Sequence, residues 1–274
     1  MTDKTGLGDR MKVYERAEAG RRCLPLLPIC ARIDGKRFSR FTVGLERPYD
    51  ERLSRLMIEV TKELVEHSHA RIGYTQSDEI SLLLHADSFG SQVFLDGRVQ
   101  KLTSILASMA TAHFNALLPR RIPEKAGKLA LFDCRVWTLP SREEAANVFL
   151  WREQDATKNS ISMAARAHYS HRELDHKNAA EMQEMLFQKG VNWNDYPAFF
   201  KRGTVVRRQV VRRAFTAEEL DSLPPMHAAR KDPELMIERS ELRELELPPL
   251  GKLRNRVAVL FEGAEPELVE QAQG

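Results

Sequence analysis

Short β-branched runs and longer stretches of helical spacing succeed one another over the first half of the chain. An apolar run over residues 24–33 ends in Asp34-Gly35, which is typical of a strand that stops at a turn. Asp50 is a candidate N-cap for the next segment, in which apolar residues recur at helical spacing. The apolar face of that segment consists of Leu53, Leu56, Met57, Val60, Leu64 and Val65. The pattern therefore predicts a strand followed by an amphipathic helix.

The same alternation continues to about residue 140. Two short runs, 70–75 and 79–85, are joined by a turn at 76–78 and indicate a β-hairpin. Helical spacing over 98–118 precedes another apolar run over 129–139. The order strand, helix, strand, strand, helix, strand is that of a ferredoxin-like βαββαβ core. We therefore expect an α+β fold whose sheet carries two helices on one face.

Beyond this core the chain changes in character. Two helices are predicted over 142–169 and 174–188, and an arginine-rich strand over 204–213. From about residue 216, acidic helix formers are mixed with pairs of prolines. We predict three parts, which are an N-terminal arm (1–22), a catalytic domain (23–213) and an appended C-terminal segment (214–274).

The composition is that of a soluble globular protein. Of the 274 residues, 42% are hydrophobic and 30% charged, which is enough to bury a core without resembling a disordered chain. No stretch reaches the roughly 18 uncharged apolar residues of a membrane helix, and the polar N-terminus has no apolar signal segment. The three cysteines, Cys23, Cys30 and Cys134, show no CxxC spacing, which favours free thiols in a reducing compartment. We therefore expect a cytoplasmic protein that has no membrane contact.

The segment GYTQSDEISLLL, residues 73–84, places two carboxylates at the start of an otherwise apolar strand. The first strand, which ends at Asp34, lies beside this hairpin in a βαββαβ sheet, so Asp34 and Asp78 are expected to converge. Two carboxylates and the carbonyl of Gly35 are the oxygen ligands that Mg²⁺ prefers. A pair of such ions stabilises both oxygens in a displacement at phosphorus. The pattern is consistent with a site for Mg²⁺ and a nucleoside triphosphate.

Basic residues near these carboxylates could bind the phosphates. Lys36 and Arg37 follow Gly35, and Lys101 and Arg135 lie on the next predicted helix and strand. Each feature alone has a simpler interpretation, such as an Asp-Gly turn, a solvated hairpin end or a surface lysine. The order of the features leaves the metal site and the simpler interpretations equally open.

Five blocks in order resemble the tRNA-histidine guanylyltransferase superfamily. They are RIDGKRFSRF (32–41), YTQSDEISLLL (74–84), FDCRVWTLPS (132–141), FLWREQDATKNS (149–160) and GVNWNDYPAFFKRGTVV (190–206). Members of this family add nucleotides to the 5′ end of tRNA in the 3′-to-5′ direction. The resemblance covers about residues 24–210 and implies a polymerase-like palm with extra helices around the βαββαβ core.

The resemblance also implies roles for single residues. Asp34, Gly35 and Asp78 match ligands of two Mg²⁺ ions, and Glu79 matches an adjacent acidic residue, so Asp34, Asp78 and Glu79 are the predicted catalytic residues. GTP and ATP are the implied substrates, and the 3′-hydroxyl of the incoming nucleotide attacks an activated 5′ phosphate of the RNA. The predicted nucleotide-binding residues are Gly35, Lys36, Arg37, Phe38, Ser39, Ser77, Lys101 and Arg135.

One block departs from the family pattern. Members that guanylylate histidine tRNA carry a His-Ile-Asn-Asn-Leu-Tyr-Asn motif, of which the run TKNSISM at 157–163 keeps only Asn159. The missing histidine and tyrosine favour the guanylyltransferase-like subtype, which repairs 5′-truncated tRNA by templated addition.

Candidates for RNA contact lie mostly around the predicted strand 204–213. We expect Arg202, Arg207 and Arg208, together with Asn159, to bind the RNA backbone. The alternative is a solvated edge strand whose charges prevent aggregation. His67, His69, His168 and His171 show no zinc-binding pattern and are interpreted as surface or capping residues.

Two other functions remain open at this stage. One is a palm-type nucleotidyl cyclase that uses the same metals without RNA, and the other is a non-catalytic RNA-binding relative. Asp34, Asp78 and Glu79 disfavour the second, because clustered carboxylates repel one another without a cation. The resemblance further implies a homotetramer.

Overall fold

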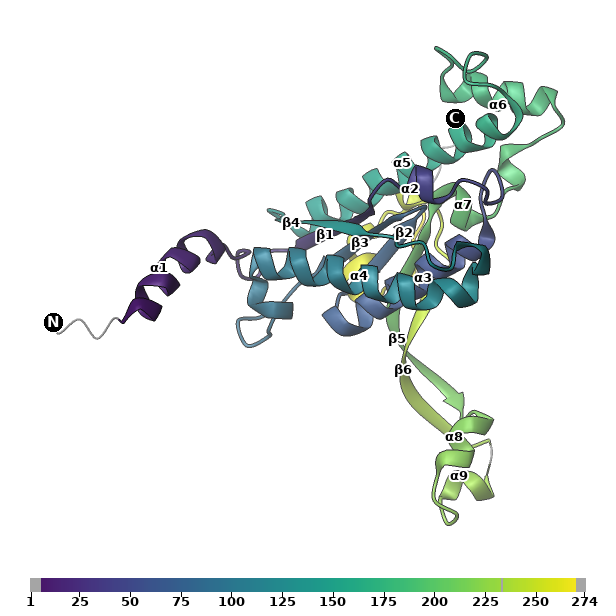
Figure 1. Ribbon diagram of the computed structural model, residues 1–274. Helices are drawn as coiled ribbons and strands as arrows, with labels where there is room; N and C mark the ends of the chain where they lie inside the picture. Colours follow the sequence, from purple (N-terminus) through teal and green to yellow (C-terminus); the bar gives the residue numbers. More distant parts are fainter. Residues whose placement is uncertain (1–5, 233, 270–274) are drawn as a thin grey trace.

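The structure is a computed structural model that describes residues 6–232 and 234–269. Its centre is a six-stranded antiparallel sheet with the order β4-β1-β3-β2-β5-β6 (Figure 1). The strands are β1 (Ile29–Gly35), β2 (Ile72–Gln76), β3 (Glu79–Leu84), β4 (Phe132–Thr138), β5 (Thr204–Ala214) and β6 (Met236–Leu245). The α-helices are α1 (Leu7–Ala19), α2 (Phe38–Phe41), α3 (Glu51–Ser68), α4 (Val99–Arg121), α5 (Arg142–His168), α6 (Ala179–Gln188), α7 (Ala198–Arg202), α8 (Ala217–Ser222), α9 (Ala228–Lys231) and α10 (Arg256–Glu262).

The expected α+β core is confirmed. β1, α3, β2, β3, α4 and β4 follow one another along the chain, and their strands lie side by side in the order β4-β1-β3-β2. The predicted N-cap of α3 is also present, because the Asp50 carboxylate accepts the N–H of Arg52 at 3.0 Å. β1 begins at Ile29 rather than at residue 24. Pro25 and Pro28 precede it, and proline has no N–H to donate to a strand ladder.

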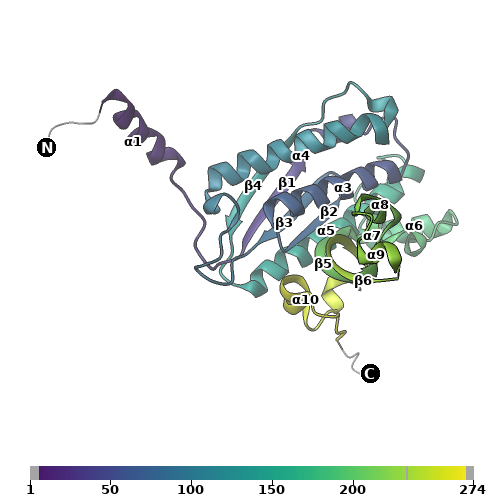
Figure 2. The same ribbon diagram turned by 90° about the horizontal axis from the view of Figure 1, so that it is seen from below.

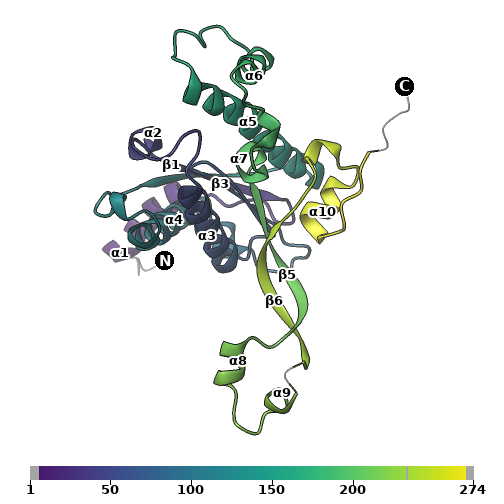
Figure 3. The same cartoon turned by 90° about the vertical axis from the view of Figure 1, so that its right-hand side faces the viewer.

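Both faces of the sheet are covered, each by a different set of helices. Ile29, Ala31 and Ile33 alternate along β1 and pack with α3 and α4, which lie over one face (Figure 2). Cys30 points the other way, into a second cluster that includes Phe149 of α5 and apolar residues of α10. α5 and α10 lie on this side of the sheet (Figure 3). Among the described residues, no helix is both long enough and apolar enough to cross a membrane.

β5 and β6 form a long hairpin that leaves the body of the protein. Only the start of β5, Thr204 to Arg207, pairs with β2, whereas β6 pairs with β5 up to its end at Ala214. The outer part of the hairpin projects from the sheet and carries α8 and α9 at its tip (Figure 1). The acidic composition of the C-terminal segment does not reveal β6, because a strand exposed on both faces lacks the apolar alternation of a half-buried strand.

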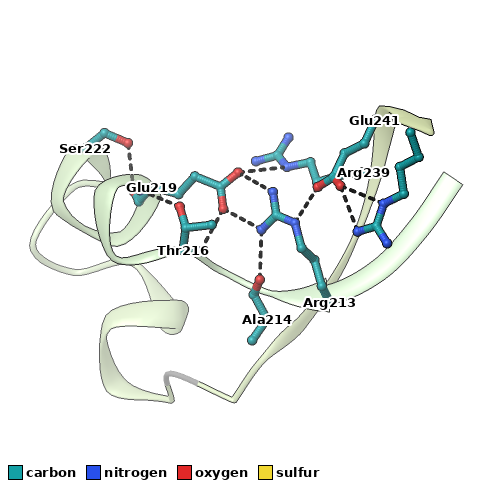
Figure 4. Close-up of polar contacts among 8 residues, drawn as sticks. Arg213, Ala214, Thr216, Glu219, Ser222, Arg239 and Glu241 are labelled. Carbon is teal, nitrogen blue, oxygen red and sulfur yellow. Dashed lines mark hydrogen bonds and ion pairs between the residues drawn. The ribbon is translucent and has the colours of Figure 1, made fainter. Parts of the chain in front are cut away.

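The tip of the hairpin is held by charged groups. Arg213 of β5 donates to Glu219 of α8 at 2.7 and 2.9 Å and to Glu241 of β6 at 2.5 Å (Figure 4). Glu219 also closes a capping box with Thr216, and the hydrogen bonds from Arg213 lower its pKa to about 2. No residue of α8 is buried, so polar contacts rather than apolar packing position this helix.

Candidate active site

The strand register brings the two predicted aspartates together at one end of the sheet. Asp34 near the end of β1 lies opposite Glu79 at the start of β3, which places the hairpin turn beside the end of β1. The N–H of Gly35 donates to the carbonyl of Asp78 at 3.1 Å. Asp34 and Asp78 therefore sit on adjacent backbone segments.

Asp34 and Asp78 are half-buried, and neither has an ion-pair partner within the described part of the chain. Within the described residues, the Asp78 carboxylate accepts one side-chain hydrogen bond, from the hydroxyl of Ser77 to its Oδ1 at 3.1 Å. Burial, together with the charge of the neighbouring Asp34, raises the pKa of Asp78 to about 6. Burial and Asp133 likewise raise the pKa of Asp34, although three arginines oppose the rise. Two partly desolvated carboxylates that repel each other form a site that a cation would stabilise.

Glu79 has a different environment. Arg152 of α5 donates to both of its oxygens, with Nε at 2.6 Å and Nη2 at 2.9 Å, and Arg32 of β1 lies 3.8 Å away. Burial raises the pKa of Glu79, while Arg152 and Arg32 oppose this shift. Glu79, which was predicted to be catalytic, therefore pairs with two arginines. Its hydrogen bonds to Arg152 fix α5 against the β2–β3 hairpin.

Three residues of the site were not predicted as site residues. Asp133 of β4 lies opposite Asp34 in the strand register and adds a third carboxylate. Arg152 pairs with Glu79, and the indole of Trp151 lies under Arg152, with its centroid 4.6 Å from the guanidinium carbon. All three stand in sequence blocks quoted above, but only the strand and helix arrangement shows which charges they face.

In the turn after Asp34, a close contact requires glycine at position 35, and several backbone N–H groups have no hydrogen-bond partner in the described chain. A Cβ on Gly35 would lie 2.2 Å from the ring of Phe38, so glycine is required for this ring to pack beneath the turn. Phe38 is buried against Phe41 and the aromatic residues of α4 and β4, so its side chain serves the core. The backbone N–H groups of residues 37–39 make no hydrogen bond within the described part of the chain. The side chains of Lys36, Arg37 and Ser39 are exposed around them.

A cavity of about 300 Å³ opens beside this turn. Its wall includes Ser39 from the turn, Ser77 from the hairpin, Tyr49 before α3, Arg166 of α5 and Phe199 of α7. The rings of Tyr49 and Phe199 meet edge to face, with centroids 5.3 Å apart. An aromatic wall with polar groups at its mouth is typical of a small-molecule site.

Two more predicted residues lie along the α5 face of the sheet. Arg135 of β4 is exposed and lies 3.9 Å from Asp133, on the same face as Asp34. Asn159 lies one turn beyond Asp155, which itself pairs with Arg152. Arg135 and Asn159 thus border the carboxylate cluster.

Other predicted residues are placed elsewhere or have partners already. Lys101 lies in the first turn of α4, which begins beside Cys23 at the opposite end of β1. A strand of this length spans roughly 20 Å, so the structure does not bring Lys101 to the carboxylates of its own chain.

The predicted RNA-binding arginines have three distinct environments. Arg207 is half-buried and donates to carbonyls at the C-terminal end of α10, with Val259 at 2.7 Å, so its guanidinium is not free for a phosphate. Arg208 pairs with Glu66 of α3, on the face away from Asp34. The side chain of Arg202 ends α7 without a hydrogen bond in the described part of the chain.

Comparison with known proteins identifies relatives of this chain. A family model described as tRNA(His) guanylyltransferase matches residues 8–140. The tRNA(His) guanylyltransferase of Eremothecium gossypii is 30% identical over 204 residues, which are 68% of this chain and 84% of that protein. The enzyme of Saccharomyces cerevisiae shows the same identity and coverage.

Solved structures agree with these matches. A bacterial tRNA(His) guanylyltransferase-like protein in complex with ATP superposes with a TM-score of 0.76 at 34% identity, over 93% of this chain and 99% of the other. A bacterial protein of the same description in complex with GTP gives a TM-score of 0.70, over 90% and 94% of the two chains.

Proposed function

This chain belongs to the tRNA(His) guanylyltransferase family, and we propose that it is a Mg²⁺-dependent enzyme that adds nucleotides to the 5′ end of tRNA. The observation that carries the proposal is the pair of half-buried carboxylates, Asp34 and Asp78, without ion-pair partners in the described chain. They lie beside an exposed turn with free N–H groups and beside a cavity with an aromatic wall. The bound ATP and GTP in two structural relatives agree with a nucleotide substrate.

The donor set fits Mg²⁺. Carboxylate and carbonyl oxygens are hard ligands, and Mg²⁺ is commonly held by one or two carboxylates with water and substrate phosphates. In our proposal Asp34, Asp78 and the carbonyl of Gly35 hold two such ions. When bound, the ions neutralise charge on the triphosphate and on the 5′ phosphate during phosphoryl transfer.

The surrounding residues of this chain would position the nucleotide. Lys36 and Arg37 are exposed, and the N–H groups of residues 37–39 make no hydrogen bond within the described chain, so all are suited to triphosphate oxygens. Ser39 and Ser77 line the cavity, which would receive the base against the wall that Tyr49 and Phe199 form. Arg135 adds a cation on the same face as Asp34.

We further propose templated repair of 5′-truncated tRNA as the preferred reaction. The run 157–163 lies within α5, where Asn159 is exposed but Ser160 is buried and accepts a hydrogen bond from the indole of Trp193 at 3.1 Å. A buried serine in this run packs α5 against the Trp193 segment. The run 157–163 lacks the histidine and tyrosine of the untemplated enzymes. One of its residues, Ser160, is buried in a packing contact and is not available to the substrate.

The RNA partner and the setting are also proposals. We propose that Asn159 and Arg202 approach the tRNA from the α5 face, because Asn159 is exposed and Arg202 is half-exposed. We propose a cytoplasmic homotetramer, in which Lys101 contacts phosphate in the site of a neighbouring subunit.

A 5′-extension assay tests the proposed function. Purified protein is incubated with Mg²⁺, each nucleoside triphosphate and a tRNA that lacks its first nucleotide and carries a 5′ mono- or triphosphate. The RNA is then resolved at single-nucleotide length. We expect product one or more nucleotides longer, formed with the nucleotide that pairs with the opposite strand.

The matched controls separate chemistry from binding. Asp78→Asn should reduce extension by at least about 100-fold, because it removes a proposed ligand without changing shape. Arg208→Gln, on the opposite face, should leave extension within about twofold. Binding of GTP with Mg²⁺ but no extension of any tRNA would contradict the proposal.

A further inference from the structure

Glu63, His67 and His113 form a cluster on the outer surface of α3 and α4. Glu63 and His67 are one turn apart on α3, and His113 faces them from α4. One ligand atom from each residue lies within 4.8 Å of the others, and this is the one such group among the described residues. The cluster lies on the sheet face opposite α5, away from Asp34 and Asp78.

Glu63 pairs with histidines, whereas three other glutamates of α3 pair with arginines. Glu51, Glu59 and Glu66 of α3 each pair with an arginine. Glu63 pairs with imidazoles instead, at 3.5 Å from Nε2 of His67 and 4.0 Å from Nδ1 of His113. No lysine or arginine in the described chain therefore competes for this carboxylate.

The distances approach those of a first-row metal site. Ligand atoms bound to a tetrahedral Zn²⁺ at about 2.0–2.2 Å lie about 3.3 Å from one another. The observed 3.5 and 4.0 Å separations require only a small side-chain rotation to reach this value. The two imidazole rings are 5.7 Å apart and tilted by 30°, so both can turn a nitrogen toward one point.

We propose that Glu63, His67 and His113 bind Zn²⁺, with water as the fourth ligand, and that the ion links α3 to α4. Two imidazoles and one carboxylate select Zn²⁺, Co²⁺ or Ni²⁺ over Mg²⁺, which prefers oxygen alone. The three side chains are 31–52% exposed, so the ion can enter without unfolding. The sequence does not show this site because His113 is far from Glu63 and His67 along the chain.

Isothermal titration with ZnCl₂, in saturating Mg²⁺, tests the proposal. We expect one ion per chain, at least tenfold weaker binding in His113→Ala and in Glu63→Gln, and unchanged binding in His171→Ala, which removes an exposed histidine elsewhere. Co²⁺ should give the visible absorption of a four-coordinate ion in the wild type but not in His113→Ala.

Two further variants keep the result interpretable. Asp78→Asn should bind Zn²⁺ as the wild type does, which separates this site from the proposed Mg²⁺ site and from the proposed function. An absence of stoichiometric Zn²⁺ binding, or equal binding in His113→Ala, would overturn the proposal and leave an ordinary solvated ion pair.

Discussion

The roles of single residues follow from the charges that they face. Asp78 and Glu79 are adjacent in the sequence, yet one lacks a cationic partner and the other is held by Arg152. Successive strand residues point to opposite faces, but here the hairpin turn and α5 decide the environments. The sequence could predict that Asp34 and Asp78 converge, since that requires only the βαββαβ order. It could not predict Arg152, because the pairing depends on how α5 crosses the sheet.

The raised pKa of Asp78 gives a test of its burial next to the charge of Asp34. An acid with a raised folded-state pKa binds its proton more tightly when folded, so metal-free protein gains stability from Asp78 as the pH falls from about 7 through 6 toward 4. In the Asp78→Asn variant the amide side chain is neutral at every pH, so the variant lacks the penalty that ionised Asp78 imposes at neutral pH. We therefore expect it to be at least as stable as the wild type at pH 7.5 in EDTA, and the difference to vanish near pH 4. Urea unfolding at both pH values measures it, and a less stable variant at pH 7.5 would refute this account.

The Arg152–Glu79 pair gives a second prediction. Both side chains are mostly buried, with exposed fractions of 11% and 16%, so removing one leaves an uncompensated charge. Arg152→Met is expected to lower the free energy of unfolding by about 3–5 kcal/mol. The double variant Glu79→Gln/Arg152→Met should recover a large part of that loss in urea titrations. Equal stability of the single and double variants would show that the charge pair is not the cause.

At the scale of elements, the regular core is predictable and the projecting hairpin is not. α3, α4 and the β2–β3 hairpin show apolar periodicity because each packs one side against a core. β6 is exposed along most of its length and follows a segment rich in proline and acidic residues. The pattern of apolar residues therefore does not indicate that this segment is a strand that pairs with β5. Within the hairpin, Arg213 also donates to Glu241, which lies opposite Gln209 in the strand register.

Among the arginines of β5 in the described chain, Arg213 is the one that contacts α8, so the hairpin tip should depend on it. In Arg213→Met, α8 loses the donor to Glu219, and we expect faster hydrogen exchange at residues 217–222 with no change in the midpoint of global unfolding. Arg212→Met, which changes the neighbouring arginine, is the control. Because the pKa of Glu219 is lowered to about 2, protection in the wild type should persist at pH 4 and disappear only as the pH falls toward 2. Unchanged exchange in Arg213→Met would mean that apolar contacts hold the tip.

At the scale of the whole molecule, the C-terminal segment and the catalytic core share one apolar cluster. Val259, Leu260 and Phe261 of α10 are buried against α5 and the sheet, and Arg207 of β5 caps the end of α10. Each fully buried side chain of this kind contributes about 1.5–3 kcal/mol. Their sum is comparable to the total stability of a typical domain, about 5–15 kcal/mol.

Truncation separates the two parts of the C-terminal segment. A chain that ends at residue 213 is expected to lose cooperative unfolding and to bind a hydrophobic dye, because it exposes the α5-facing apolar cluster. Replacement of residues 216–234 by a short glycine-containing turn removes only the tip and should shift the melting temperature by no more than a few degrees. Calorimetry on both variants compares them directly. A stable, cooperative 1–213 chain would show that the core folds without α10.

The central claim is that Asp34 and Asp78 hold the catalytic ions. The most direct measurement is a crystal structure with Mn²⁺ and a non-hydrolysable GTP analogue, in which anomalous scattering locates the metal. We predict anomalous peaks in contact with the carboxylates of Asp34 and Asp78, with the triphosphate on the turn at residues 36–39. A bound triphosphate whose Mn²⁺ lies elsewhere, with Asp34 and Asp78 making no contact to it, would contradict the account.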